Sequence, residues 1–474
     1  MPTDNDSVDN LISSTIAVIV AAESTPDRPP PTFEEEVKAR EHALHVARIR
    51  AAVWGVLTIL FVVGLGLVFG LKEKTAEWGL SGELPRNKWK AAGKVLDMAP
   101  VIDGHIDLPI LARMGFANNV SAIDLEHRMV GQVDIPRLRQ GKVGGFFWSV
   151  YVGCVPNDQD PDFLDATWQV RDTIEQVDVS KNLIEKYPDT FQLAMSTNDI
   201  YSAITSGKIA SLLGIEGAHS LGNSIAVLRQ FYALGVRYLT LTHGCHNAFA
   251  DSSGDPTPRH SGLSPLGYAL VDEMNRLGML VDVSHTSDLT AAQVLKYSKA
   301  PVIFSHSSAR SVHDHPRNVP DDVLELIGDG EGQQDAVVMV NFVTDFIARP
   351  GMADVHVVAN HIEHIARVAG KKHVGLGSDY DGMQDAPAGL EDASKYPALI
   401  AELYARGWTR LELAGLTGAN LLRVFTGAER VSAELKKAGA QPVYDLYAAR
   451  RDLPREKFPS VQGGGGLVVQ ADEL

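Results

Sequence analysis

The sequence lacks clustered basic residues. Lys and Arg total 43 against 59 Asp and Glu in 474 residues, so the formal net charge is −16. Proteins that bind nucleic acid neutralise its phosphates with a stripe of Lys and Arg side chains, and no such stripe occurs along this chain. The composition therefore argues against nucleic acid as a partner. We expect the acidic residues simply to solvate the surface.

The sequence also lacks a signal sequence of ordinary form. Its long apolar run, residues 51–71, begins too far along the chain, and no small-residue cleavage site clearly follows it. These 21 residues carry no charge and lie between Arg50 and Lys72, which suits the roughly 20 residues needed to cross a bilayer. We therefore expect a transmembrane helix there, with a buried core helix as the alternative. Residues 467–474 hold too few apolar residues for a removable lipid-anchor tail.

The organisation of the chain follows from this segment. Residues 33–50 are expected to be helical and to continue into the span. The last helices are expected at residues 397–406 and 409–425, the second beginning with a capping box formed by Thr409 and Glu412. The expected parts are a disordered, partly helical tail (1–50), the transmembrane helix (51–71), a polar stalk (72–93), a barrel (94–430) and a C-terminal extension (431–474).

Eight short apolar runs, rich in β-branched residues, recur between residues 101 and 381 and are separated by segments long enough for a helix. A strand covered by helices on both faces is apolar throughout rather than alternating. The pattern therefore predicts an α/β fold, a parallel (β/α)8 TIM-like barrel, whose chemistry lies at the carboxyl ends of the strands. The runs are residues 101–107, 144–151, 211–217, 236–243, 278–285, 301–306, 336–342 and 373–381.

Several of these runs end in groups that bind metals. His105 and Asp107 are two residues apart on one strand, so their side chains point the same way. Glu216 ends another run, and a carboxylate has two oxygens that can bridge two ions. Borderline divalent ions such as Zn2+ accept imidazole and carboxylate together, so we expect a metallohydrolase. The alternatives are a salt bridge at the barrel mouth and ordinary core histidines. The expected ligands are His105, Asp107 and Glu216 for one ion, and Glu216, His285 and His306 for the other.

Other polar residues near the strand ends have no place in that ligand set. His243 could stabilise a developing oxyanion, and Asp379 could move protons or serve as a further ligand. Arg317 could clamp a substrate carboxylate with two hydrogen bonds, although a surface salt bridge with Asp321 or the residue after it is the alternative. Asp103 is a candidate for orienting a metal ligand.

Seven stretches together resemble the membrane dipeptidase (renal dipeptidase) family of dizinc metallopeptidases. They are VIDGHID, GIEGAH, RYLTLTHGCHNAFAD, LVDVSH, PVIFSHSSARSV, RNVPDDVL and HVGLGSDYDG, within residues 101–382. The resemblance implies two Zn2+ ions bridged by Glu216, a bridging water as nucleophile, and dipeptide substrates with a free C-terminal carboxylate. It also implies that His243 contacts the substrate and the tetrahedral intermediate, that Arg317 holds the carboxylate, and that Asp379 is the acid/base group.

The chain departs from this family at two points. Animal members are typically held by a C-terminal lipid anchor, whereas a membrane-spanning helix is expected here near the amino terminus. Phe346 falls where relatives place a substrate-contacting Tyr. The only two cysteines, Cys154 and Cys245, fall at positions resembling a disulfide of the family, with free thiols as the alternative.

An oxidising compartment fits that disulfide, and Asn119 begins a glycosylation sequon. Both favour a cytosolic amino terminus and a barrel on the lumenal or extracellular side. The final residues ADEL resemble an endoplasmic-reticulum retrieval signal, although the first position departs from it. The sequence leaves a homodimer open. It also leaves two competing functions, another binuclear metal amidohydrolase and an inactive barrel that acts as a receptor or scaffold.

Overall fold

The computed structural model describes residues 32–77, 83–156, 158–164 and 167–450. The chain divides into two units, Met1–Glu83 and Leu84–Leu474, which are described separately. The expectations for the tail before residue 32 and for the terminal ADEL residues fall outside the described residues.

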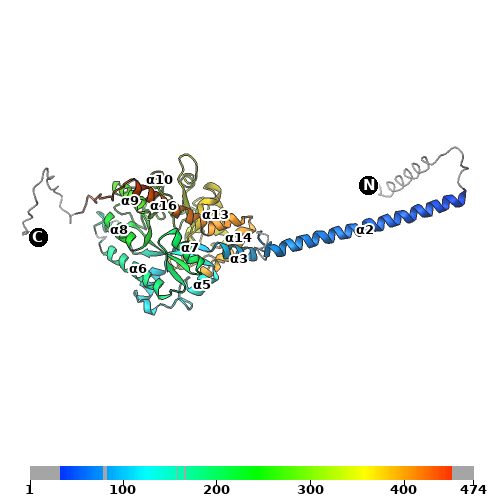
Figure 1. Ribbon diagram of the computed structural model, residues 1–474. Coiled ribbons are helices and arrows are strands. Elements are labelled where there is room, and N and C mark those ends of the chain that lie inside the picture. Colours follow the sequence, from blue (N-terminus) through cyan, green and yellow to red (C-terminus); the bar gives the residue numbers. More distant parts are fainter. Residues whose placement is uncertain (1–31, 78–82, 157, 165–166, 451–474) are drawn as a thin grey trace, which may run out of the picture. The chain divides into compact units, whose positions relative to one another are not determined.

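Within residues 32–77, the first unit contains one long helix, α2 (Phe33–Glu77), of 45 residues (Figure 1). The helix expected at residues 33–50 therefore does continue into the apolar run. Segment Phe33–Gly64 is long and apolar enough to cross a membrane, and none of its apolar window is buried. Helix α2 is therefore a candidate membrane segment, either an anchor or a signal sequence.

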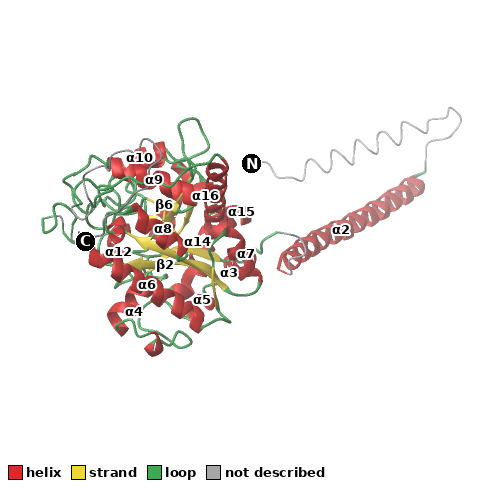
Figure 2. Ribbon diagram, turned by 60° about the vertical axis from the view of Figure 1, so that its left-hand side comes forward, coloured by secondary structure: helices red, strands yellow, loops and turns green. Residues whose placement is uncertain are grey.

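The second unit contains a nearly closed parallel barrel, surrounded by helices in Figure 2. The strand order is β1-β2-β4-β5-β6-β7-β8-β9, and a parallel bridge between Ile106 and Tyr380 links the last strand region back to the first. The predicted α/β TIM-like barrel is thus confirmed. Its strands are β1 (Val101–Ile106), β2 (Val143–Tyr151), β4 (Ile209–Glu216), β5 (Val236–Thr240), β6 (Leu280–Asp282), β7 (Val302–Phe304), β8 (Ala336–Val340) and β9 (Val374–Leu376).

The strands are apolar on both faces because each face meets its own core. Side chains such as Leu212, Ile303 and Met339 form a cluster inside the barrel. Neighbouring residues such as Ile215 and Phe304 belong to a second cluster with the helices. Burying apolar surface on both faces is the main force that stabilises this arrangement.

Helices follow most of the strands and begin at polar caps. The side chains of Ser264 and Ser287 accept hydrogen bonds from the first turns of α9 and α10. The helices of this unit are α3 (Lys88–Met98), α4 (Leu108–Phe116), α5 (Ile135–Gln140), α6 (Thr167–Lys186), α7 (Thr197–Thr205), α8 (Ile225–Ala233), α9 (Pro265–Leu277), α10 (Asp288–Tyr297), α11 (Asp321–Leu324), α12 (Thr344–Ile347), α13 (Val355–Val368), α14 (Tyr396–Ala405), α15 (Arg410–Ala414) and α16 (Asn420–Lys437).

Three details differ from the sequence-based expectations. A short strand, β3 (Phe191–Leu193), pairs with the beginning of β4, where β5 does not reach; three residues are too few for a recognisable pattern. The second unit begins at Leu84 rather than at residue 94, because α3 buries its apolar face in the core. The capping box of Thr409 and Glu412 is present, but the helical segment runs on to Lys437, past the expected end of the barrel.

Candidate metal centre

The predicted metal ligands converge at the carboxyl ends of the barrel strands. His105 lies in β1 with Asp107 just after it, Glu216 ends β4, and His285 and His306 follow β6 and β7. Because the strands are parallel, their carboxyl ends meet at one mouth of the barrel. All five side chains are largely buried there.

The two oxygens of the Glu216 carboxylate face different imidazoles. Oε1 lies 2.9 Å from Nε2 of His285 and 3.3 Å from Nε2 of His306. Oε2 lies 3.7 Å from Nε2 of His105, whose Nε2 is also 3.3 Å from Oδ2 of Asp107. Glu216 therefore lies at the centre of the cluster, with ligand atoms on both sides.

Three overlapping groups of possible ligands have all their ligand atoms within 4.8 Å of one another. Two of the groups contain Glu216. The structure thus brings the five predicted ligands together with His243 and Asp379, but the distances do not divide them into the two predicted sets. The groups are His105, Glu216 and His306; Glu216, His243 and His285; and His105, Asp107 and Asp379.

The donor set suits a cation. Nε2 of His105 is buried without a hydrogen-bond partner, while its Nδ1 lies 2.8 Å from the Tyr238 hydroxyl. Burial alone would lower the pKa of His105, but the carboxylates of Asp107 and Glu216 raise it to about 10. A concentration of negative charge that draws a proton to a buried nitrogen also favours a metal ion there.

The environments of His285 and His306 favour the neutral imidazole. Burial lowers the pKa of His306 to about 4, and burial with the nearby positive charge of Arg317 lowers the pKa of His285 well below its usual value. Neutral imidazole is the form that coordinates metals. Both histidines are therefore in the state that ligation requires.

Backbone strain is concentrated at two of the predicted residues. His285 has φ 63° and Asp379 has φ 69°, a left-handed conformation that is uncommon for residues other than Gly. The Asp379 backbone N–H donates to the carbonyl of His105 at 3.0 Å, and its Oδ1 lies 4.0 Å from Nε2 of His105. Burial raises the pKa of Asp379 to about 6. The structure therefore holds a weakly acidic carboxyl group directly beside the ligands.

His243 and His105 face different oxygens of the Glu216 carboxylate. Its Nε2 is 3.8 Å from Oε1 of Glu216, and its ring lies 4.3 Å from the His285 ring and 4.5 Å from the Tyr151 ring. Burial lowers the pKa of His243. The imidazole is thus a neutral group at the edge of the cluster, where it can donate a hydrogen bond to bound substrate.

Arg317 is buried rather than on the surface, with 9% of its area exposed. Its Nη2 donates to the carbonyl of His306 at 3.3 Å, and its guanidinium carbon lies 5.3 Å from the Phe346 ring. Asp321 pairs instead with His364 at 2.7 Å, so the surface salt bridge considered for Arg317 is not formed with that residue.

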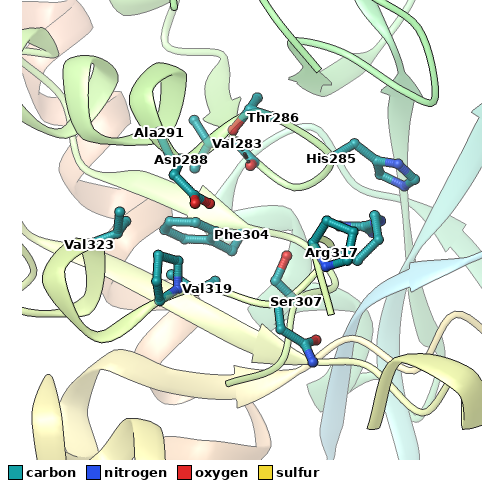
Figure 3. A pocket seen from close by; sticks show the side chains of 13 residues that line it. Val283, His285, Thr286, Asp288, Ala291, Phe304, Ser307, Arg317, Val319 and Val323 are labelled. Carbon is teal, nitrogen blue, oxygen red and sulfur yellow. Dashed lines mark hydrogen bonds between the residues drawn. The ribbon is translucent and has the colours of Figure 1, made fainter. Parts of the chain in front are cut away.

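Arg317 and His285 border a small cavity beside the cluster. Figure 3 shows them on one side of it, with Phe304, Val319 and Val323 on the other. The guanidinium Nε is buried without a hydrogen-bond partner. This cation therefore has hydrogen-bonding capacity that an anionic group could use.

Two tyrosines at the site were not singled out by the sequence. Tyr238 holds Nδ1 of His105 from inside the barrel, and Tyr151 packs against His243. Tyr151 ends the second apolar run and Tyr238 lies within the fourth. The sequence could have indicated them only through a tyrosine hydroxyl at a strand position that faces the barrel interior. This signal is weak because tyrosines are common in strands.

The two cysteines form the predicted disulfide. Cys154 and Cys245 are joined, with their Cα atoms 6.3 Å apart, so the free-thiol alternative is wrong. The bond links the loops that follow β2 and β5. Asn119 is exposed and precedes a short 3-10 helix, η1 (Val120–Ala122), and its glycosylation stays a prediction.

A parallel barrel whose mouth gathers histidines and carboxylates around one Glu is typical of metal-dependent hydrolases. The model of the membrane dipeptidase family, peptidase family M19, matches residues 89–439. The chain belongs to this family, so it is a dipeptidase of the metallopeptidase class.

Individual relatives agree with this family. The dipeptidase verJ of Clonostachys rogersoniana is 43% identical over 359 residues, covering 75% of this chain and 90% of that protein. An uncharacterised dipeptidase of Schizosaccharomyces pombe is 47% identical over 362 residues, covering 73% and 87%. A metallopeptidase from Rhodobacter sphaeroides, solved with a phosphinate mimic of the dipeptide L-Ala-D-Ala, has a TM-score of 0.62 and 25% identity, covering 69% of this chain and 99% of that one.

Proposed function

We propose that this protein is a membrane-tethered, zinc-dependent dipeptidase that hydrolyses dipeptides with a free C-terminal carboxylate. The observation that carries the proposal is Glu216, whose Oε1 faces His285 and His306 and whose Oε2 faces His105. The Rhodobacter sphaeroides relative, which holds a dipeptide mimic, supports the substrate class.

The proposed ligands would hold two Zn2+ ions, with Glu216 between them. Imidazole nitrogen and carboxylate oxygen are ligands that Zn2+ accepts. When bound, such a pair of ions polarises a carbonyl and lowers the pKa of an attacking water. The ligands are His105, Asp107 and Glu216 for one ion, and Glu216, His285 and His306 for the other.

The remaining residues are proposed to handle protons and bind substrate. Asp379 would take a proton from the attacking water and pass it to the leaving amine, a role that suits a carboxyl group whose pKa is raised to about 6. His243 would donate to the oxygen that gains negative charge. Arg317 would bind the terminal carboxylate through its guanidinium, whose Nε has no hydrogen-bond partner.

The proposed topology places the amino terminus in the cytosol and the barrel on the lumenal or extracellular side. It is supported by the Cys154–Cys245 disulfide, which is typical of oxidising compartments, and by exposure of the Asn119 sequon. Helix α2 would provide the tether.

Metal analysis of the purified full-length protein in detergent, followed by assay on a dipeptide library, tests the proposal. We expect about two Zn2+ per chain and dipeptide cleavage that a chelator abolishes. Well under one ion per chain, with no cleavage after zinc is added, would contradict it and favour the receptor or scaffold alternative. Bound zinc with hydrolysis of cyclic amides or esters alone would favour the other amidohydrolase.

A further inference from the structure

A buried polar network lies beneath the metal cluster. None of its members has a role in the proposed catalysis. Its centre is Asp282, the last residue of β6, which is 0% exposed. Oδ1 accepts hydrogen bonds from the backbone N–H groups of Ser284 at 3.1 Å and Ser305 at 2.8 Å. Oδ2 accepts from the hydroxyls of Thr240 at 2.5 Å and Ser305 at 2.6 Å. Asp282 therefore ties together the ends of β5, β6 and β7.

This network determines which way the Ser305 hydroxyl points. A hydroxyl has one hydrogen, and in Ser305 it is donated to Asp282. The same oxygen lies 2.7 Å from Nδ1 of His306, so towards the imidazole it can only accept. Nδ1 of His306 must therefore carry the hydrogen, and Nε2 is left with its lone pair. That Nε2 faces Oε1 of Glu216 at 3.3 Å.

We propose that Asp282, acting through the Ser305 hydroxyl, is a positioning residue that fixes the tautomer of His306 and directs its Nε2 lone pair at the metal. The inference rests on the proposed metal site. Groups that hold the outer nitrogen of a ligating His orient its ring and raise its basicity. Here the carboxylate acts through an intervening hydroxyl instead of bonding to the imidazole directly.

The backbone of the same region is held by the same group. The Ser284 hydroxyl accepts a hydrogen bond from the His306 backbone N–H at 3.0 Å, and the Ser284 N–H donates to Asp282. His285 follows directly. Asp282 thus also supports the strand end that presents the neighbouring ligand.

His105 is one contact further from the Ser305 hydroxyl than His306 is, because it meets the Tyr238 hydroxyl, which in turn interacts with Ser305. Nδ1 of His105 lies 2.8 Å from the Tyr238 hydroxyl, and the described contacts of Asp282 do not include His105. The Ser305 hydroxyl contacts His306 directly but reaches His105 only through Tyr238, so its loss should weaken the ion bound by His306 more than the ion bound by His105.

Thr240 offers a matched control, because its hydroxyl donates to the same oxygen of Asp282 but does not contact His306. Ser305→Ala and Thr240→Val each remove one buried hydroxyl at little change in shape. The probe is Zn2+ alone, titrated into the metal-free full-length protein against a competing chelator. We expect Ser305→Ala to weaken one of the two ions by about 10–100-fold. Thr240→Val should leave both affinities unchanged while losing similar thermal stability.

Equal zinc affinities for Ser305→Ala and wild type, or an equal loss in Thr240→Val, would overturn the inference. A second measurement needs no variant: in the zinc-loaded wild type with 15N-labelled histidine, the hydrogen of His306 should reside on Nδ1, and its absence would overturn the inference even if Ser305→Ala fails to fold. Wild type that binds no zinc would contradict the proposed function instead. Two bound ions in wild type with no effect of Ser305→Ala would contradict this inference alone.

Discussion

Nε2 of His285 lies 2.9 Å from Oε1 of Glu216, while the other oxygen of the same carboxylate faces His105 across 3.7 Å. The Glu216 side chain therefore faces both His285 and His105, whereas each of these imidazoles faces only one oxygen of the Glu216 carboxylate. This asymmetry separates the effects expected of substituting the two residues.

Glu216→Gln should weaken both metal ions, because an amide nitrogen replaces one of the two oxygens that the ions are proposed to share. His285→Ala should weaken mainly one. We expect a loss in affinity of at least the roughly 10–100-fold that removal of an outer hydrogen-bond partner produces. Inductively coupled plasma analysis after dialysis measures this, with circular dichroism to confirm folding. Full metal content in Glu216→Gln would show that the bridging assignment is wrong.

Asp379→Asn should lower kcat by about 10²–10⁴-fold, because an amide cannot accept and return a proton. The fold and most of the metal should remain, since Asn tolerates the left-handed backbone of this position, φ 69°. Steady-state kinetics with parallel metal analysis checks the result. If metal content falls together with activity, Asp379 is a metal ligand instead. This alternative is consistent with its Oδ1 lying 4.0 Å from Nε2 of His105.

The barrel and its ligands could be predicted because each depends on local sequence. Strands covered on both faces must be apolar, and a ligand such as His306 interrupts that apolar pattern where the strand ends. The role of Asp282 could not be predicted, because it depends on the register that places Thr240 and Ser305 beside it. Tyr238 was missed for the same reason, since its hydrogen bond to His105 joins residues 133 positions apart.

Asp381→Asn should change how stability depends on pH. Burial raises the pKa of Asp381 to about 7, above its ordinary 3.8. The folded protein thus holds a proton that the unfolded chain releases, so the stabilisation is full below about pH 4 and is lost as pH rises through about 7. Wild type should lose stability relative to the variant over this range.

Urea unfolding at several pH values measures this difference. Asn suits the site because Oδ1 of Asp381 accepts from the Gln132 N–H at 2.5 Å, while Oδ2 is buried without a partner, and because φ is 68°. Parallel curves for the two proteins would mean that Asp381 titrates normally.

Replacing both cysteines by Ser should lower the free energy of unfolding without removing metal. The disulfide joins residues 91 positions apart, and closing such a loop restricts the unfolded chain, which is typically worth about 2–4 kcal/mol. Chemical denaturation of Cys154→Ser/Cys245→Ser under oxidising conditions checks the size. The disulfide holds loops beside the cluster but supplies no ligand, so the metal content of the variant should match that of wild type. A lower metal content in the variant would show that these loops shape the metal centre.

Arg317→Ala should chiefly raise KM for dipeptides, by an amount equivalent to about 2–5 kcal/mol for a buried charge pair that loses one partner. Lys should restore binding only in part, because an ammonium group cannot make the two-pronged contact of a guanidinium. Metal content and fold should remain, since the described side-chain contacts of Arg317 are with the His306 carbonyl and the Phe346 ring, and its backbone hydrogen bond to His315 does not depend on the side chain.

A dipeptide with an amidated C-terminus should reproduce much of this defect in the wild type, because it lacks the carboxylate that Arg317 is proposed to bind. The two losses should then be far from additive, since both remove the same ion pair. Steady-state kinetics of wild type and Arg317→Ala on the free and amidated peptides form the required cycle. If amidation leaves the wild-type kinetics unchanged, Arg317 is structural, and the preference for a free carboxyl end loses its main physical support.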